Sequence, residues 1–409
     1  MDKSPVEIWL WLLLVLLPHN ARTSEILRIY GGSALDAAKA MRDGECQLSA
    51  AERQRVERTR TREVRSLINE CERLGIRIVT LDDDEYPQQL REISDPPIVL
   101  FVRGSLMPLR TMPALAVVGP RQPSEYGRKV CERLCSESAG DGVAIISGIA
   151  VGIDACAHRC TVNNGGYTVA VLGCGLMVNY PGENEELKEA ILQSGGALVS
   201  ELLPYASVSQ GYFKHRNRII SGLADAALIV EASSRSGALL TAAHAVKQGR
   251  ALLCIPPQDI FAERFSGLSQ LLSQGARPVC SICDLYSAMI ETDGRAAALR
   301  RLLPQKEKQW LGSLSAVRPA LVRPAELRQN KPKEVPCVPQ QPAAKPTPDV
   351  SQLSPEEGEV VSLIAEGAMT MDELIEKTGI QSDKLCAVIL GLEINDVITR
   401  TREGTFLLC

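Results

Sequence analysis

Six short apolar segments recur between residues 115 and 256, and they constrain the fold more than any other feature of the sequence. Each is followed by a turn rich in Gly, Ser or Asn and then by a helical pattern. Strands that are apolar on both faces are typical of a parallel sheet covered by helices on both sides. The sequence therefore predicts an α/β fold with a doubly wound, mostly parallel sheet, whose strands are Leu115–Gly119, Val143–Ser147, Thr168–Gly173, Ala197–Glu201, Ala226–Glu231 and Ala251–Pro256.

Two further strands are expected upstream, at Ile76–Leu81 and Ile98–Val102. Before residue 75 the pattern is helical, with short segments separated by glycines and with arginines interleaved among glutamates. We expect a small all-α domain over residues 1–75, of the SAM or helix-hairpin-helix kind, followed by the α/β domain over residues 76–294.

The apolar run Ile8–Leu17 has two interpretations. Its length suits the apolar region of a secretory signal peptide, but it is too short to span a bilayer. Asp2 and Glu7 lie upstream of or at its start, and no small-residue cleavage pattern follows it. We therefore expect a buried first helix and no membrane partner.

Residues 295–349 differ from the rest of the chain. They hold 11 basic and 4 acidic residues and nine prolines, without an apolar period that we could identify. Such a composition does not bury enough surface to fold. The prediction is a basic, Pro-rich, disordered linker.

The last segment, residues 350–409, predicts helices at Ser354–Glu366, Met371–Lys377 and Ser382–Asn395 and a hairpin at Val397–Leu408. That order is typical of a winged-helix-like domain. Residues 352–409 hold 4 basic and 11 acidic residues, a charge that phosphates repel. We expect a protein-contact or regulatory module.

Composition limits the function classes. A net charge of -4 is not that of a chain that binds nucleic acid over its whole surface, so any DNA contact has to be local. The 13 cysteines are scattered, with one CxxC at Cys280–Cys283, which argues against a disulfide framework or a structural zinc site. A reducing cytoplasm is the expected compartment.

Polar, glycine-rich loops follow the predicted strands at the edge where ligands bind in such sheets. They are Gly119–Gly127, Ser147–His158 and Ser233–Ala242. Arg121 stands free in the first loop, and exposed amides at the helix starts suit an anion. Each loop alone is equally compatible with an ordinary turn and helix cap.

The segment Phe213–Leu223 crowds Lys214, His215, Arg216 and Arg218 around Asn217. Guanidinium groups suit phosphate oxygens, and an aromatic ring offers a stacking face for bases. The alternative is a core face built from the apolar residues, with arginines that pair with acids. Single-stranded nucleic acid accounts for all the residue types together.

Five segments occur in an order that resembles the motif series of the DprA/Smf family of DNA-processing proteins: Gly119–Gly127, Ser147–Asp154, Leu172–Pro181, Phe213–Leu223 and Ser236–Ala242. The resemblance spans most of residues 76–290 and extends to Leu81–Pro87 and Asp95–Pro97. It implies an extended Rossmann-like domain that binds single-stranded DNA, forms a homodimer and helps to load a RecA-type recombinase onto incoming strands during natural transformation. By position, the resemblance implies that Arg121, Arg216, Asn217 and Arg218 face the DNA. The residues that it implies shape the same pocket are Ser147, Gly148, Gly152, Asp154, Ser236, Gly237 and Thr241. Lys214 is a further DNA-binding candidate because of its charge.

The sequence departs from the usual family pattern at several positions. Two departures remove cations, because Val151 stands where an arginine is common and Gly182 where a lysine often follows Tyr180-Pro181. Pro257 and Leu268-Ser269 also differ. Fewer phosphate contacts predict weaker binding and a shallower dependence on salt than in typical relatives.

We expect no catalytic residue, no cofactor and no metal ion. The alternative is a nucleotide or nucleoside-phosphate enzyme, for which Glu231, at the end of a strand, is the candidate catalytic residue. A dinucleotide oxidoreductase fits least, because no G-x-G-x-x-G opens the first helix of the sheet domain.

Overall fold

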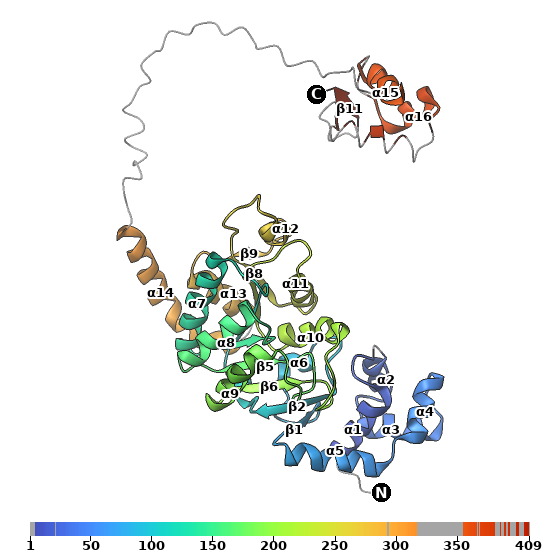
Figure 1. Ribbon diagram of the computed structural model, residues 1–409, viewed down its shortest axis with the longest axis vertical. Coiled ribbons are helices and arrows are strands. Elements are labelled where there is room, and N and C mark those ends of the chain that lie inside the picture. The colour runs from blue at the N-terminus through green and yellow to red at the C-terminus, as the bar shows by residue number, and fades with distance from the viewer. Residues whose placement is uncertain are drawn as a thin grey trace. The chain divides into compact units, whose positions relative to one another are not determined.

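The computed structural model describes most of the chain, in two units that divide near residue 319. The described residues are 5–20, 22–292, 294–316, 355–365, 367, 369–380, 385, 388, 389, 392, 398–400 and 405–408. Figure 1 shows the course of the chain and labels its elements.

Within the described part of the first unit, nine strands form one sheet in the order β1-β2-β6-β5-β4-β3-β7-β8-β9. In this order, the strands β6, β5, β4, β3, β7, β8 and β9 are all parallel to one another. β2 pairs antiparallel with β6, and β1 pairs antiparallel with β2. The predicted doubly wound, mostly parallel sheet is therefore confirmed. Its strands are β1 (Arg77–Thr80), β2 (Val99–Gly104), β3 (Ala114–Val118), β4 (Ala144–Ser147), β5 (Thr168–Val171), β6 (Ala197–Ser200), β7 (Ala226–Ile229), β8 (Ala251–Cys254) and β9 (Arg277–Pro278).

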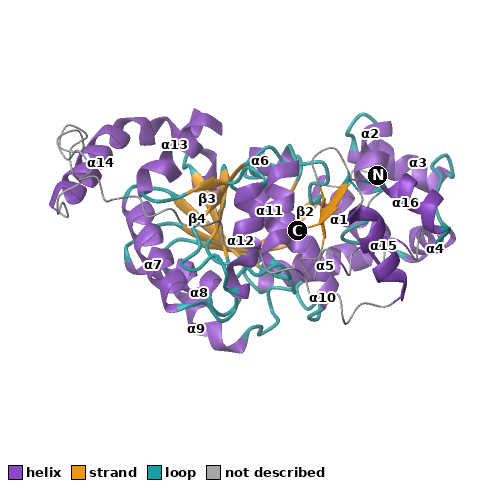
Figure 2. Cartoon of the chain, turned by 90° about the horizontal axis from the view of Figure 1, so that it is seen from above, coloured by secondary structure: helices purple, strands orange, loops and turns teal. Residues whose placement is uncertain are grey.

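The central strands are apolar because both of their faces are covered by helices (Figure 2). On β3, Ala116 and Val118 contribute to a core with α10, α11 and α12, whereas Leu115 and Val117 contribute to a second core with α7, α8 and α13. Each fully buried Val or Leu contributes roughly 1.5–3 kcal/mol to stability. The helices that follow the N-terminal domain are α6 (Gln88–Arg91), α7 (Glu125–Gly140), α8 (Ile153–Asn163), α9 (Glu185–Gln193), α10 (Gln210–Gly222), α11 (Ala238–Lys247), α12 (Ser266–Ser273), α13 (Ile282–Thr292) and α14 (Ala297–Ala316).

The N-terminal helices pack beside β1 and β2 (Figure 1). The apolar run at the start of the chain forms α1, whose Trp9, Trp11 and Leu12 are almost completely buried. The expected buried helix is thus confirmed. In the described residues no helix combines the length and apolar character needed to cross a membrane. The five helices of this region are α1 (Pro5–Leu16), α2 (Thr23–Ile29), α3 (Ala34–Asp43), α4 (Ala50–Arg58) and α5 (Thr61–Arg73).

The strand order reverses direction between β3 and β7. From β3 the chain adds β4, β5 and β6 on one side, and it then returns to place β7, β8 and β9 on the other. A crevice forms at such a switch point because the loops after the two neighbouring strands lead to helices on opposite faces. The glycine-rich loops of the sequence meet here.

The structure corrects the linker expected from residue 295. That stretch begins with α14, which runs to Ala316 despite Pro304 in its interior. Leu299, Leu302 and Leu303 lie on one helical face and pack into the core beside α13, and Lys306 lies 2.9 Å from Glu137 on α7. Tertiary packing therefore outweighs the low helix propensity of proline. Residues 317–349 lie outside the described residues.

The second unit contains α15 (Pro355–Ala365), α16 (Met371–Thr378) and an antiparallel pair, β10 (Ile398–Arg400) and β11 (Phe406–Leu408). Its core includes Val360, Leu374, Leu392 and Phe406. These elements agree with the first two helices and the hairpin of the predicted winged-helix-like domain. The third predicted helix, residues 382–395, lies largely outside the described residues.

Leu299→Ala tests whether α14 is part of the folded core. Leu299 is fully buried, so the truncation is expected to lower the free energy of unfolding by about 3 kcal/mol. Leu311→Ala, in the same helix at a side chain that is 58% exposed, is expected to change it by less than about 0.5 kcal/mol. Urea denaturation measures both values. Equal stability of the two variants would contradict the packing of α14.

Candidate nucleic-acid interface

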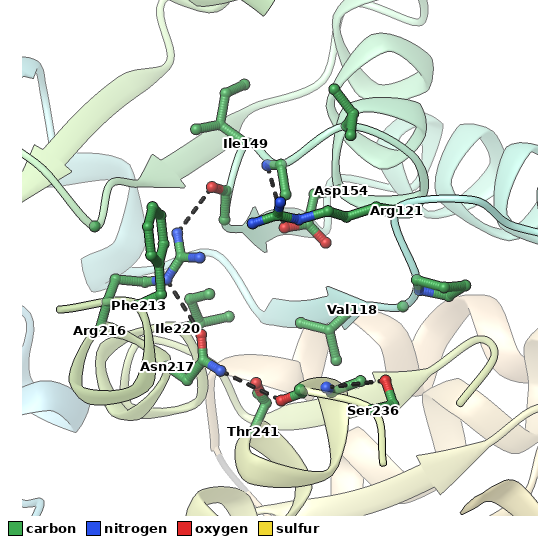
Figure 3. A pocket seen from close by; sticks show the side chains of 18 of the residues that line it. Val118, Arg121, Ile149, Asp154, Phe213, Arg216, Asn217, Ile220, Ser236 and Thr241 are labelled. Atoms are coloured by element: carbon green, nitrogen blue, oxygen red, sulfur yellow. Dashed lines mark hydrogen bonds between the residues drawn. The ribbon is translucent and has the colours of Figure 1, made fainter. Parts of the chain in front are cut away.

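A cleft of about 730 Å³ opens at the carboxyl ends of the central strands. Its walls are the loops after β3, β4, β5 and β7 together with the first halves of α10 and α11. Figure 3 shows Arg121 reaching into it from the loop after β3, with Phe213, Arg216 and Asn217 on the α10 side. The volume is within the range of ligand pockets, about 300–1,000 Å³.

The structure brings nine of the twelve predicted DNA-binding residues to this cleft. Ser147, Gly152 and Arg218 do not line it. The nine that do are Arg121, Gly148, Asp154, Lys214, Arg216, Asn217, Ser236, Gly237 and Thr241.

Arg216 lines the cleft but is buried, with 6% of its surface exposed. Its Nη1 donates to the carbonyl oxygen of Gly148 at 2.8 Å and to that of Val171, and its Nε donates to Oδ1 of Asn217 at 3.2 Å. Burial lowers the pKa of Arg216, although the Asp154 carboxylate opposes this shift. The guanidinium thus joins α10 to the ends of β4 and β5 and places a charge beneath the cleft.

The loop after β4 is shaped by its glycines. A side chain at Gly148 would collide with the Arg216 guanidinium, 2.6 Å from the ideal Cβ position. Gly152 has a φ of +90°, and a Cβ there would lie 2.3 Å from the carbonyl oxygen of Pro120. Ser147 is buried and donates to the carbonyl oxygen of Val117 at 2.6 Å. Ser147 and Gly152 therefore support the cleft from behind.

Arg218 faces away from the cleft. It is buried, and its two terminal nitrogens donate to Glu201 at 3.0 and 2.7 Å while its Nε donates to Asp95 at 3.1 Å. Residues two positions apart on a helix point in different directions, so Arg216 and Arg218 do not face one ligand together. Arg218 therefore lies outside the cleft that holds the other predicted DNA-binding arginines, and it joins α10 to Glu201, directly after β6. Its predicted contact with DNA stays a prediction.

Two cations at the cleft are exposed. Arg121 and Lys214 are solvent-exposed, and neither forms an ion pair with the residues that the structure describes. Arg264, a cleft residue that the sequence reading did not single out, pairs with Glu231 at 2.9 Å. Positive charge for a ligand thus comes first from Arg121 and Lys214.

Aromatic rings line the same wall as Lys214. Phe213 on α10 and Tyr180, after β5, have ring centroids 5.5 Å apart at a tilt of 49°. Both are cleft residues. Phe213 was predicted as a stacking face, whereas Tyr180 lay in a motif segment without an assigned role. A nucleobase stacks on such faces without a sequence preference.

The start of α11 forms the opposite wall. Ser236 accepts a hydrogen bond from the amide of Ala238 at 3.2 Å, and Asn217 donates to the carbonyl oxygen of Gly237 at 3.5 Å. Asn217 therefore connects α10 to α11. Thr241, one turn along α11, completes this wall. The first amides of a helix favour an anion nearby.

The acidic residues of the cleft have structural partners. Glu231 is buried and accepts from the amide and hydroxyl of Ser124, at 3.0 and 2.6 Å, which fixes the start of α7. Burial raises the pKa of Asp154, which accepts from the amide of Ala150 at 3.4 Å. These contacts give Glu231 a structural role at the start of α7.

Nothing in the described residues groups three or more His, Cys, Asp or Glu side chains in a way that could hold a metal ion. His158 is fully buried and its Nδ1 lies 2.7 Å from the hydroxyl of Thr168. Burial, and next the Arg216 charge, lower the pKa of His158 to about 3. The His158 side chain is therefore neutral at neutral pH, and it lies on the buried face of α8.

The doubly wound sheet places the chain in the Rossmann-like class, with a cation-bearing cleft at its switch point. The family model for DNA recombination-mediator protein A matches residues 77–290, and the model for the DprA winged helix domain matches residues 342–404. The chain belongs to the DprA/Smf family of DNA-processing proteins.

Individual relatives agree with this assignment. The chain is 34% identical over 217 residues to DNA processing protein DprA of Bacillus subtilis, covering 53% of this chain and 72% of that one. Protein Smf of Escherichia coli is 42% identical over 200 residues, 49% of this chain and 53% of that one. The X-ray structure of DprA from Streptococcus pneumoniae matches with a TM-score of 0.61 at 31% identity, covering 70% of this chain and 98% of that one.

Glu201→Gln tests the buried pair behind the cleft. Burial alone would raise the pKa of Glu201, but Arg218 and then His19 lower it to about 2. The ionised Glu201 carboxylate therefore stabilises the folded state fully above the ordinary carboxyl pKa, and this stabilisation is lost as pH falls towards 2. At neutral pH the variant is expected to be less stable by about 3–5 kcal/mol, because the buried Arg218 guanidinium loses its charged partner Glu201 and keeps only Asp95, whose side chain is 38% exposed.

The pH dependence separates this pair from a surface contact. Between about pH 6 and pH 3, wild type is expected to lose about 2 kcal/mol more stability than Glu201→Gln. Glu189→Gln, which removes a partly exposed pair with Arg103, is expected to follow wild type closely. Parallel pH profiles for wild type and Glu201→Gln in urea denaturation would contradict the pairing.

Proposed function

We propose that this chain binds single-stranded DNA in the cleft and acts as a recombination mediator, without catalysing a reaction. The observation that carries the proposal is the meeting, in one cleft, of exposed unpaired cations, helix-start amides and aromatic faces. Cations and amides suit phosphates, and the rings suit bases that are not stacked in a duplex. Membership of a DNA-processing family supports the same proposal.

Binding follows from electrostatic positioning. Phosphates approach Arg121 and Lys214 and the amide-rich starts of α8 and α11, while Arg216 contributes charge from beneath the cleft wall. Bases stack against Phe213 and Tyr180. Because phosphate contacts and stacking carry no base identity, sequence preference is expected to be weak and affinity to fall steeply with salt.

The finer assignments rest on the family resemblance. We propose that the chain protects incoming strands and helps to load a RecA-type recombinase during natural transformation. A homodimer through the Rossmann-like domain would present two clefts to one strand and gain avidity. The ten described cysteines are free thiols, which supports the proposal of a reducing cytoplasm.

Arg121→Ala is the direct test of the cleft. Loss of one phosphate contact is expected to weaken binding of a single strand of about 30 nucleotides by about five- to ten-fold and to lower the slope of log K against log salt by about 0.7. Fluorescence anisotropy across a salt series measures both. Arg128→Ala removes an exposed arginine of α7 outside the cleft and is the matched control. An unchanged affinity in Arg121→Ala would contradict the assignment.

Gly182→Lys tests the cleft by gain of function. Gly182 follows cleft residue Pro181, and a Cβ added there would have Oδ1 of Asn179 as its nearest contact, at 3.9 Å. The family-typical lysine at this position is therefore expected to fit, to tighten single-strand binding by about three-fold and to steepen the salt slope by about 0.7. Gly182→Ala provides the control for backbone effects. Equal affinity of the two variants would indicate that the DNA strand does not pass close to residue 182.

A further inference from the structure

The turn after α1 lies against the helix that carries the cleft. Nδ1 of His19 is 3.0 Å from Oε2 of Glu201, and the two side chains are 8% and 6% exposed. The His19 ring stacks on His215 at a centroid distance of 4.6 Å and lies 5.6 Å from the ring of Tyr212. His215 and Tyr212 both belong to the first half of α10.

The N-terminal domain holds this turn in a defined shape. Leu17 and His19 have φ angles of 67° and 66°, a region that non-glycine residues rarely adopt. The side chain of Asn20 donates to the carbonyl oxygen of Leu16 and to Glu52, each at 2.9 Å. Unfavourable backbone angles persist only where surrounding contacts fix them. His19 is therefore presented by a rigid support.

Phe213 holds the first half of α10 through its own packing, because its ring lies beside Tyr180 and over Gly173. The rest of this half has little buried surface. Its N-cap residue, Ser209, makes no side-chain cap hydrogen bond, and its buried residues begin only at Arg216. Yet Phe213 and Lys214, which face the cleft, lie in this half. A helix end without a cap and with little buried surface opens easily.

One carboxylate connects the N-terminal turn to the rest of α10. Glu201, directly after β6, accepts hydrogen bonds from both terminal nitrogens of Arg218, and its Oε2 is the atom that lies 3.0 Å from Nδ1 of His19. The turn therefore contacts α10 directly through the rings and indirectly through Glu201. Glu201 thus meets Arg218 of α10 on one side and the His19 ring on the other, which helps to hold α10 in place.

We propose that His19 is a positioning residue for the single-strand site, which makes the N-terminal helical domain a working part of that site. The inference rests on the proposed function of the cleft. His19 touches no cleft ligand itself; it fixes the half of α10 that presents Phe213 and Lys214. A strand then binds a helix that is already in place, and less ordering accompanies binding.

The test replaces His19 by Asn, because Asn tolerates a positive φ but lacks the ring. Single-strand affinity is expected to fall by about five-fold, the size expected from loss of an aromatic stack and a partly buried polar contact. Asp82→Asn is the matched control. It alters another contact of the N-terminal domain with the sheet domain, the 2.8 Å hydrogen bond from Trp9, which does not touch α10.

Hydrogen exchange in the DNA-free protein supplies a second readout. His19→Asn is expected to speed amide exchange in the first half of α10, whereas Asp82→Asn leaves that segment unchanged. His19→Phe keeps a ring to stack on His215 but, unlike Asn, is strained at the positive φ of this position. It is therefore expected to restore only part of the affinity and of the protection. If His19→Phe recovers affinity and exchange protection that His19→Asn lacks, the ring positions α10, and the loss in His19→Asn is not a general loss of the N-terminal fold.

Each outcome decides a separate point. If wild type fails to bind single strands, the proposed function fails, and the exchange experiment still decides whether His19 holds α10. If wild type binds and His19→Asn matches it in affinity and exchange, the positioning role is wrong. If His19→Asn and Asp82→Asn weaken binding and speed exchange equally, the effect belongs to domain docking in general, which also overturns the proposal.

Discussion

Two buried arginines fix helix α10 to the sheet, and the cleft keeps its shape only while that helix stays in place. Arg216 donates to backbone carbonyls at the ends of β4 and β5. Arg218 donates to Glu201, directly after β6, and to Asp95, in the loop before β2. A buried guanidinium is tolerated only when its donors are satisfied. Displacement of α10 would leave the guanidinium groups of Arg216 and Arg218 buried without hydrogen-bond acceptors. The position of the helix is therefore strongly specified.

This arrangement divides the basic residues by role. The buried arginines build the wall, whereas exposed Arg121 and Lys214 remain available to a ligand. The division reconciles a chain of net charge -4 with a local polyanion site, because only a few cations need to be exposed at the right place. It also explains why a cluster of basic residues in one segment overstates the number of phosphate contacts.

The sheet could be predicted closely because burial on both faces leaves a continuous apolar signal. The strand expected at Leu115–Gly119 is observed at Ala114–Val118. The orientation of Arg218 could not be predicted, since the acids that bury it, Glu201 and Asp95, are distant in sequence. The short strand β9 and helix α14 were missed for a similar reason: prolines and charge dominate these segments locally, and tertiary contacts decide their structure.

Photocrosslinking with an iodouracil-substituted single strand, followed by mass spectrometry of the linked peptides, tests the central claim most directly. Aromatic side chains that stack on bases react preferentially, so the account predicts crosslinks to Phe213 and Tyr180, at the α10 wall of the cleft. Crosslinks confined to residues 317–354 or to the C-terminal domain, with none at the cleft, would contradict it. That result would place the strand elsewhere on the chain and leave the cleft to a different anion.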